Sequence, residues 1–410
     1  SDHYFNQISH KITDRLNTEI MEQSIQELMQ RYDILRTAFI YDKYDAPLQL
    51  VMKERKSDFQ YLDVRRDCAN PRDEEVIEKY EKKDRSKKFD LGKDTLIRVT
   101  VLRLEDELYH IIWSYHHILL DGWSLGLVLK DFIHIYENKL KNITETKPTI
   151  QPFKNYIKWL ESKELNEGLN FWKKYLENYE EIVTLPSKQK ENNNFKLNSK
   201  YFVTTDDEMK NIMKVSTSLG VSVNTIIQGI WGLILAKFNN TNDVVFGSIV
   251  SGRSLELDGV EDMVGLFMNI IPVRVTFDSD ASLVSLFTKI QERALESEAY
   301  HYESIGEIQA QSSLGNNLFD HFIAFENYAL DEGLLAAESL NEKRAFNIQD
   351  IKAFEQTNYD LVVGVFPGKN LAIKFEYNEN HFERALIDNI CSYLRQIFAS
   401  IHKSLDKKVK

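Results

Sequence analysis

The sequence predicts an α/β protein built of two lobes. At 410 residues the chain is longer than one ordinary hydrophobic core accommodates. Strand and helix patterns alternate in both halves, which is typical of α/β folds. Residues 138–152 are polar, contain Pro148 and Pro152, and lack periodicity, so they form a candidate seam. We therefore expect one lobe at residues 1–148 and a second at residues 149–410.

The first lobe contains a mixture of period-2 and helical patterns. Strands are expected at residues 5–12, 35–40, near 58, 96–104 and 108–115. The last two form a hairpin around residues 105–107. Helices are expected from Asn17 onward, in the charged stretch ending near Lys88, and after Ser124, whose hydroxyl can cap a helix.

The second lobe opens with an aromatic-rich helical region at residues 153–179, followed by a polar loop at 188–198. Strands are expected at residues 200–204, 243–249, 270–277, 320–326, 361–365 and 371–377, with a closing helix at 382–404. Residues 221–238 are the most apolar stretch. Because they include Asn224, Gln228 and Lys237, they predict a buried helix rather than a membrane span.

Composition excludes several classes of function. The composition, 43% hydrophobic and 28% charged, is that of a folded soluble protein, and the formal net charge of −12 argues against a nucleic-acid-binding or anionic-membrane surface. Cys68 and Cys391 lie far apart without metal-ligand spacing, and the first residues do not resemble a signal peptide. We expect a cytoplasmic protein that uses no metal.

The stretch from His116 to Ser124, with the sequence HHILLDGWS, is the most informative motif. Two adjacent histidines are followed by an apolar spacer and by Asp121-Gly122 at the start of a predicted helix. A histidine held at the end of a strand can handle a proton near neutral pH, which acyl transfer to an amine or an alcohol requires.

Over its whole length the chain resembles a condensation domain of a nonribosomal peptide synthetase. Five segments carry the resemblance in the family's order: residues 31–39 (R-x-x-x-L-R-T-x-F), 116–124 (HHxxxDGxS), 153–159, 251–253 and 264–274. The family's opening motif is absent because the chain begins beyond it, so we expect a truncated N-terminus. Residues 312–317 lack the arginine of a late motif.

The resemblance implies two chloramphenicol acetyltransferase-like lobes that form a V-shaped pseudo-dimer with the active site in the cleft. It implies formation of an amide bond between a donor aminoacyl or peptidyl thioester and the α-amine of an acceptor aminoacyl thioester. The implied partners are upstream donor and downstream acceptor peptidyl carrier proteins and an adjacent adenylation domain. Phosphopantetheine arrives on the carriers, and the domain itself binds no cofactor. Residues 122–126 and 326–328 resemble domains that join an L-donor to an L-acceptor.

The resemblance marks His117 as the active histidine. Residue chemistry leaves open whether it acts as a general base or positions the amine, and we favour positioning with stabilisation of the tetrahedral intermediate. His116 should point to the opposite face of the strand, in a structural role. Gly122 is expected to adopt a conformation that disfavours side chains, with its N–H facing an oxyanion.

Asp121 is expected to form a buried ion pair that fixes the loop, with Arg31, Arg36 or Arg274 as its partner; a second catalytic group is the alternative. The remaining candidates have both structural and substrate-lining interpretations. They are Trp123 (core or site lining), Ser124 (helix cap or site lining), Asn269 (strand end or lobe interface) and Arg253 (tunnel lining).

Two other functions share these motifs. An epimerization domain has the same fold and histidines, but it needs a second acid/base group, usually a glutamate in a motif that this sequence lacks. A catalytically silent domain of the same fold that only docks a partner enzyme is the other alternative, and the intact HHxxxDG pattern argues against it.

Overall fold

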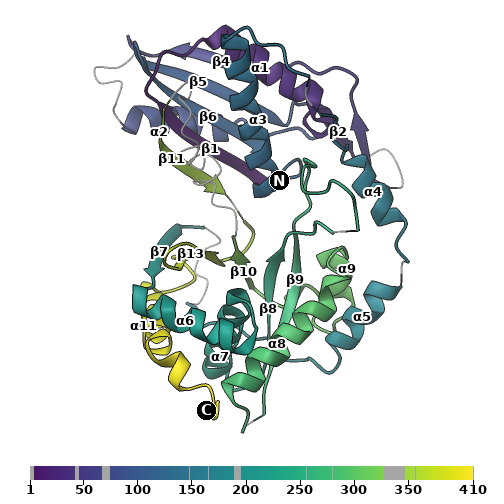
Figure 1. Ribbon diagram of the computed structural model, residues 1–410, viewed down its shortest axis with the longest axis vertical. Helices are drawn as coiled ribbons and strands as arrows, with labels where there is room; N and C mark the ends of the chain where they lie inside the picture. Colours follow the sequence, from purple (N-terminus) through teal and green to yellow (C-terminus); the bar gives the residue numbers. More distant parts are fainter. Residues whose placement is uncertain are drawn as a thin grey trace. The chain divides into compact units, whose positions relative to one another are not determined.

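The computed structural model describes residues 4–41, 46–66, 74–146, 148–164, 166–188, 195–254, 256–278, 280–326, 347–355 and 357–409. Helices and strands alternate along the chain, as Figure 1 shows, and the predicted α/β class is confirmed. Cys68 and the residues at 327 and 328 lie outside the described ranges.

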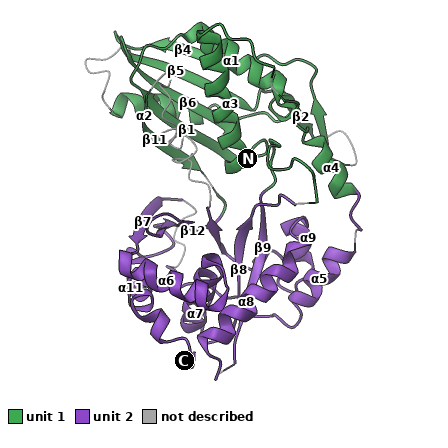
Figure 2. Cartoon of the chain, in the orientation of Figure 1, with its two compact units in different colours: residues 1–161, 255–267, 328–358 green, residues 162–254, 268–327, 359–410 purple. Residues whose placement is uncertain are grey.

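The chain divides into two compact units (Figure 2). The first comprises residues 1–161, 255–267 and 328–358, and the second comprises residues 162–254, 268–327 and 359–410. This division differs from the continuous ranges 1–148 and 149–410 expected from the sequence. Two later segments pack with the first unit because they bury apolar side chains in its core. A pattern along the chain does not reveal such an exchange.

The first unit is built on a five-stranded sheet in the order β11-β1-β6-β5-β4. These strands are β1 (Phe5–Ile12), β4 (Asp58–Asp63), β5 (Ile97–Glu105), β6 (Leu108–His116) and β11 (Ile348–Glu355). β5 and β6 form the predicted hairpin, and β6 also pairs antiparallel with β1. β6 is thus a central strand, and all nine of its residues are buried.

Alternate residues of β6 face two different clusters, as the pleat of a strand requires. Tyr109, Ile111 and Trp113 join the main core. The helices α1 (Thr18–Arg31) and α3 (Gly122–Leu140) pack together and contribute to this core. Leu108 and Ile112 face a smaller cluster with α2 (Glu74–Arg85). The helices therefore cover both faces of the sheet (Figure 1).

Two short elements replace the strand expected at residues 35–40. A 3-10 helix, η2 (Asp33–Arg36), precedes β2 (Thr37–Ile40), which pairs only with β3 (Leu48–Val51). Asp33 accepts a hydrogen bond from the Arg36 guanidinium, which stabilises this turn. The local ion pair explains why the chain turns before it extends.

The second unit holds a six-stranded sheet in the order β7-β13-β12-β10-β8-β9. Its strands are β7 (Leu197–Val203), β8 (Asp243–Val250), β9 (Asn269–Thr276), β10 (His321–Phe325), β12 (Leu361–Phe366) and β13 (Ala372–Asn378). All six lie within three residues of the expected positions. The parallel pairs are β10 with β8 and β10 with β12.

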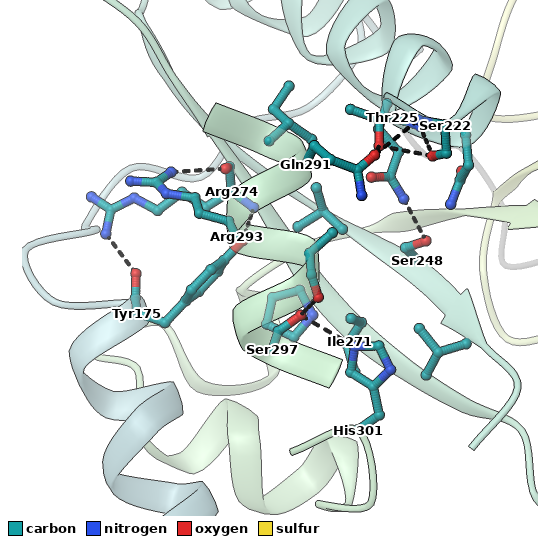
Figure 3. Close-up of a pocket in the computed structure, with 17 residues that line it drawn as sticks. Tyr175, Ser222, Thr225, Ser248, Ile271, Arg274, Gln291, Arg293, Ser297 and His301 are labelled. Atoms are coloured by element: carbon teal, nitrogen blue, oxygen red, sulfur yellow. Dashed lines mark hydrogen bonds between the residues drawn. The ribbon is translucent and has the colours of Figure 1, made fainter. Parts of the chain in front are cut away.

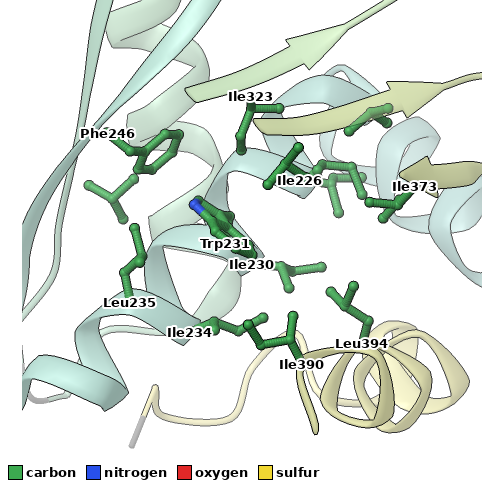
Figure 4. Close-up of a cluster of buried hydrophobic side chains, with 14 of the residues drawn as sticks. Ile226, Ile230, Trp231, Ile234, Leu235, Phe246, Ile323, Ile373, Ile390 and Leu394 are labelled. Carbon is green, nitrogen blue, oxygen red and sulfur yellow. The ribbon is translucent and has the colours of Figure 1, made fainter. Parts of the chain in front are cut away.

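Helices cover both faces of this second sheet as well. One face packs on α6 (Asp206–Leu219), α7 (Val223–Asn239), α8 (Leu283–Glu298) and α11 (Arg384–Ser400), through the cluster around Trp231 drawn in Figure 4. The other face packs on α5 (Glu167–Tyr175) and α9 (Ile305–Ala310). The expected helical region at 153–179 is divided into two helices, α4 (Lys154–Glu161) and α5. The second unit also contains two short 3-10 helices, η3 (Gly315–Asn317) and η5 (Ile401–Lys403).

Most of α7 is buried in the second unit, as the polar residues in this apolar stretch predicted. Within the described ranges, no single helix has the length and apolar character of a membrane span. α6 and α7 satisfy those criteria only when taken together, and they meet at an angle of 106°.

Candidate active site

The end of β6 places the two histidines. His116 is the last residue of the strand, and His117 begins the turn that leads to α3. The His117 N–H donates to the Tyr4 carbonyl oxygen at 2.7 Å, which holds the turn against the chain before β1. The His117 side chain is half-buried and makes no hydrogen bond to any residue in the described part of the chain. Its ring nitrogens therefore keep their hydrogen-bonding capacity.

His116 is buried, with 9% of its surface exposed. Its Nδ1 accepts a hydrogen bond from the Ile118 N–H at 3.1 Å, and its ring lies beside Tyr4. Burial, together with the neighbouring His117 charge, lowers the pKa of His116 to about 4. A neutral His116 is consistent with Nδ1 as an acceptor and shapes the turn that carries His117.

We predict that acidification destabilises the fold partly through His116. Its folded pKa lies below the unfolded value of about 6.5, so the unfolded state binds more protons between pH 6.5 and 4. The free energy of unfolding should therefore fall by roughly 1–2 kcal/mol between pH 6.5 and pH 5 from this residue alone. His116→Asn keeps a side-chain acceptor but cannot titrate, so urea unfolding of this variant should show a flatter pH dependence. If the free energy of unfolding depends on pH in the same way in the variant and the wild type, His116 does not contribute to the acid destabilisation.

Asp121 joins two parts of the first unit. It is the N-cap of α3, where its Oδ1 accepts from the Ser124 N–H at 2.7 Å. Its Oδ2 accepts from the Phe267 N–H at 3.0 Å, and its own N–H donates to the Gly265 carbonyl oxygen at 3.3 Å. One buried carboxylate thus fixes both the start of α3 and the segment 256–267.

Two neighbours in the motif bind the same segment. The Ser124 hydroxyl donates to the Gly265 carbonyl oxygen at 2.7 Å and accepts from the Gly265 N–H at 3.1 Å. The Trp123 indole N–H donates to the Glu261 carbonyl oxygen at 2.9 Å, while the side chain remains 44% exposed. The expectation that Ser124 caps α3 is wrong, because Asp121 occupies the cap and the Ser124 side chain turns to Gly265.

Gly265 is required where the segment meets aromatic side chains. A Cβ at this position would lie about 2.0 Å from the Phe153 ring. Phe153 in turn packs edge-on against Phe267, with ring centroids 5.2 Å apart. The segments 153–159 and 264–274, which are separate motifs in the sequence, therefore meet beneath the start of α3.

We predict that Asp121→Asn weakens this junction. An amide can satisfy either the Ser124 N–H or the Phe267 N–H, but not both, so one buried donor loses its acceptor at a cost of about 1–3 kcal/mol. Hydrogen exchange measured by mass spectrometry should become faster in residues 256–267. Asp121→Ser isolates the Phe267 contact, because serine retains the cap but has no second oxygen for the Phe267 N–H. Unchanged exchange in residues 256–267 in both the asparagine and the serine variant would show that Oδ2 does not hold the segment.

Gly122 is the first residue of α3. Its φ is not positive, so the expected conformation unfavourable to side chains is wrong: an N1 residue has ordinary helical angles. The Gly122 N–H, however, makes no hydrogen bond to any residue that the structure describes. A free N–H at the positive end of a 19-residue helix is suited to bind a negatively charged oxygen.

The three arginines expected to pair with Asp121 have other partners. Arg31 pairs with Asp131 at 2.6 Å, and Arg36 pairs with Asp33 and also donates to the Met52 carbonyl oxygen. Arg274, in the second unit, forms a two-point pair with Asp243. The prediction was wrong for these three because each pairs with a carboxylate within its own unit. The Asp121 oxygens accept from the backbone N–H groups of Ser124 and Phe267.

Asn269 and Arg253 belong to the second unit. Asn269 Nδ2 donates to the carbonyl oxygens of His301 and Glu303, so it joins the start of β9 to the chain between α8 and α9. Arg253 is half-buried beside Gly252, whose φ is +62°. Across the described ranges, no group of three or more His, Cys, Asp or Glu side chains could hold a metal ion.

Sequence reasoning missed Gly265, Phe267 and Phe153 as supports of the motif. A signal existed, because residues 153–159 and 264–274 stand out as motifs, but chain order places both in the second lobe. The sequence alone did not indicate that they return to the first unit.

Known proteins support a family assignment. The family described as "Condensation domain" matches residues 1–410. The chain is 35% identical to bacitracin synthase 3 of Bacillus licheniformis over its full length, and 36% identical to gramicidin S synthase 2 of Brevibacillus brevis over 95% of its length. It spans only 6% and 9% of those two proteins.

Solved structures share the fold. The X-domain from teicoplanin biosynthesis superposes with a TM-score of 0.84 over 99% of this chain and 92% of that one, at 16% sequence identity. At this identity the likeness concerns the fold.

Proposed function

The chain belongs to the condensation domain family, and from this premise we propose that it catalyses peptide-bond formation. The donor would be an aminoacyl or peptidyl thioester, and the acceptor would be the α-amine of an aminoacyl thioester. The observation that carries the proposal is the half-buried His117 ring, free of hydrogen bonds to the described residues, in the turn between β6 and the start of α3.

The proposed reaction is an acyl transfer. The acceptor amine attacks the donor carbonyl carbon, a C–N bond forms, and the C–S bond breaks to release the donor thiol, which takes up the proton lost by the amine. A His117 ring nitrogen would hold the attacking amine by a hydrogen bond and stabilise the tetrahedral intermediate. Positioning of this kind lowers the barrier by fixing the reacting atoms before the bond forms.

Gly122 would act on the developing oxyanion. The N–H at the start of α3 has no acceptor within the helix, and the helix dipole favours negative charge at this end. The buried carboxylate of Asp121 would not react. Asp121, Ser124 and Trp123 would hold the start of α3 on segment 256–267 so that the Gly122 N–H keeps a fixed direction.

The substrates would arrive on carrier proteins. The related proteins are named as synthases of bacitracin and gramicidin S, and this chain matches a small part of each. We propose that upstream and downstream peptidyl carrier proteins present phosphopantetheine thioesters, that an adenylation domain is adjacent, and that the domain binds no cofactor of its own. A cytoplasmic location fits these substrates, and nucleic acid and membrane are not proposed as partners. Asn269 and Arg253 remain candidate tunnel-lining residues.

Product chemistry tests the proposal. Loaded donor and acceptor carriers mixed with the domain should give a dipeptidyl thioester on the acceptor carrier, with an L-donor preferred over a D-donor. Racemised donor without peptide would instead identify an epimerase. Carrier binding without any product would identify a docking domain, and either result would overturn the proposal.

A further inference from the structure

A cavity of about 110 Å³ lies within the second unit, between α7, α8 and the strands β8 and β9. Figure 3 shows Ser222, Thr225 and Gln291 at one end and Arg274, Arg293 and Tyr175 at the other. Among the described residues that line it there is no aspartate or glutamate. The walls therefore carry positive charge and uncharged polar groups.

Arg293 supplies a positive charge that no carboxylate of the described residues neutralises. Arg274 is neutralised by Asp243, with N–O distances of 2.9 and 2.6 Å. Arg293 donates to the Arg274 carbonyl oxygen at 3.0 Å, and within the described ranges it forms no ion pair. A half-buried guanidinium with unused N–H groups favours a bound anion.

The other end of the cavity offers further donors. The Gln291 Oε1 accepts from the Ser222 N–H at 2.9 Å and from the Thr225 hydroxyl at 2.8 Å. These two bonds orient the amide, and its Nε2 makes no hydrogen bond to the described residues. Ser222 caps α7, a helix of 17 residues whose positive end lies at this wall.

The cavity also contains acceptors that lack a donor. Asn224 Oδ1 is buried and receives no hydrogen bond within the described part of the chain. Gln228 is 5% exposed; its amide nitrogen donates to the Ser248 hydroxyl at 3.1 Å, and its carbonyl oxygen has no donor among the described residues. A ligand that carries an O–H as well as charged oxygens would satisfy both kinds of group.

We propose that this cavity binds a small phosphate-type oxyanion that carries one O–H, either free hydrogen phosphate or the singly protonated phosphate of a small monoester. An engineered apolar cavity of about 150 Å³ takes up benzene, so about 110 Å³ suffices for an ion of this size. Hydrogen phosphate has unprotonated oxygens that can accept from Arg293 or from Gln291, and an O–H that can donate to Gln228 or Asn224. This site goes beyond the proposed peptide-bond formation and does not rest on it.

Thermal unfolding of the full chain in phosphate, sulfate or chloride at equal ionic strength tests the site. Phosphate should raise Tm in a saturable way, because a ligand of the folded state stabilises it. Sulfate has no O–H near neutral pH, so its apparent Kd should be at least about tenfold higher, the value of one hydrogen bond. Methyl phosphate at about pH 5, where its phosphate retains one O–H, distinguishes the source. Binding comparable to that of phosphate at the same pH indicates a monoester, and weaker binding indicates the free ion.

Two variants test the role of Arg293, and a crystal soak locates the bound anion. Arg293→Gln should weaken phosphate binding at least about tenfold, whereas Arg384→Gln, which removes an exposed cation of α11, should not. Crystals soaked in arsenate should show anomalous density in the cavity even if Arg293→Gln is unstable. Any of three results would overturn the proposal. These are equal Tm shifts with phosphate, sulfate and chloride, an equal loss of phosphate affinity in the two variants, and an empty cavity after the arsenate soak.

Discussion

His117→Ala should reduce the rate of dipeptide formation by about 10²- to 10³-fold, the cost of removing one side chain that stabilises the tetrahedral intermediate. The ring makes no hydrogen bond to the described residues, so its removal should leave the fold nearly as stable as before. The measurement is the single-turnover rate with saturating loaded carriers, together with Tm. A large loss of rate at unchanged Tm is the predicted combination.

His117→Gln separates two roles for this residue. Glutamine can form a hydrogen bond but cannot accept a proton near neutral pH. If His117 positions the amine, as we propose, the glutamine variant should retain a measurable part of the rate lost in the alanine variant. Wild-type rates in the alanine variant would remove His117 from the reaction.

Gly122→Pro should reduce the rate by about 10²- to 10³-fold, the cost of losing one oxyanion donor. Proline is suited to the first helical position because its fixed φ is helical and the N–H it lacks is not used within the helix. The preceding residue must be extended, and Asp121 already is, with φ −87° and ψ 174°. The substitution therefore removes the N–H with little change in the backbone.

Gly122→Ala is the matched control. It adds a Cβ at the same position but retains the N–H, so any steric effect of a side chain appears in both variants. We expect the alanine variant to react much faster than the proline variant, with Tm values that differ by a few degrees at most. Equal rates in the two variants would mean that the Gly122 N–H does not contact the developing oxyanion.

Much of the fold could be predicted because its periodic patterns are strong. The residues of β1 match the expected strand, and α1 begins at Thr18, directly after Asn17, where a helix was expected to start. β12 differs from its expected range by one residue at its end, and β10 is one residue shorter at each end. Local patterning and capping chemistry determine these elements, and both are visible in the sequence.

The supports of the motif could not be predicted because they depend on long-range contacts. Asp121 is separated from Phe267 by 146 residues, and β11 joins the first sheet from a position more than 330 residues beyond β1. A buried carboxylate suggested Arg31, Arg36 or Arg274 as a partner, but these three pair with other carboxylates, and Asp121 accepts from two backbone N–H groups. No spacing in the sequence distinguishes these outcomes.

NMR can measure whether the Gly122 N–H contacts the oxygen of the reacting carbonyl. The sequence contains two Asp-Gly pairs, at residues 121–122 and 258–259, so labelling with ¹³C-carbonyl aspartate and ¹⁵N-glycine gives two selectable amide signals. When a donor carrier that bears a phosphonate mimic of the tetrahedral intermediate is added, the Gly122 amide proton should shift downfield as it gains a charged acceptor. A bound mimic that leaves the Gly122 signal unchanged would show that this N–H does not stabilise the oxyanion.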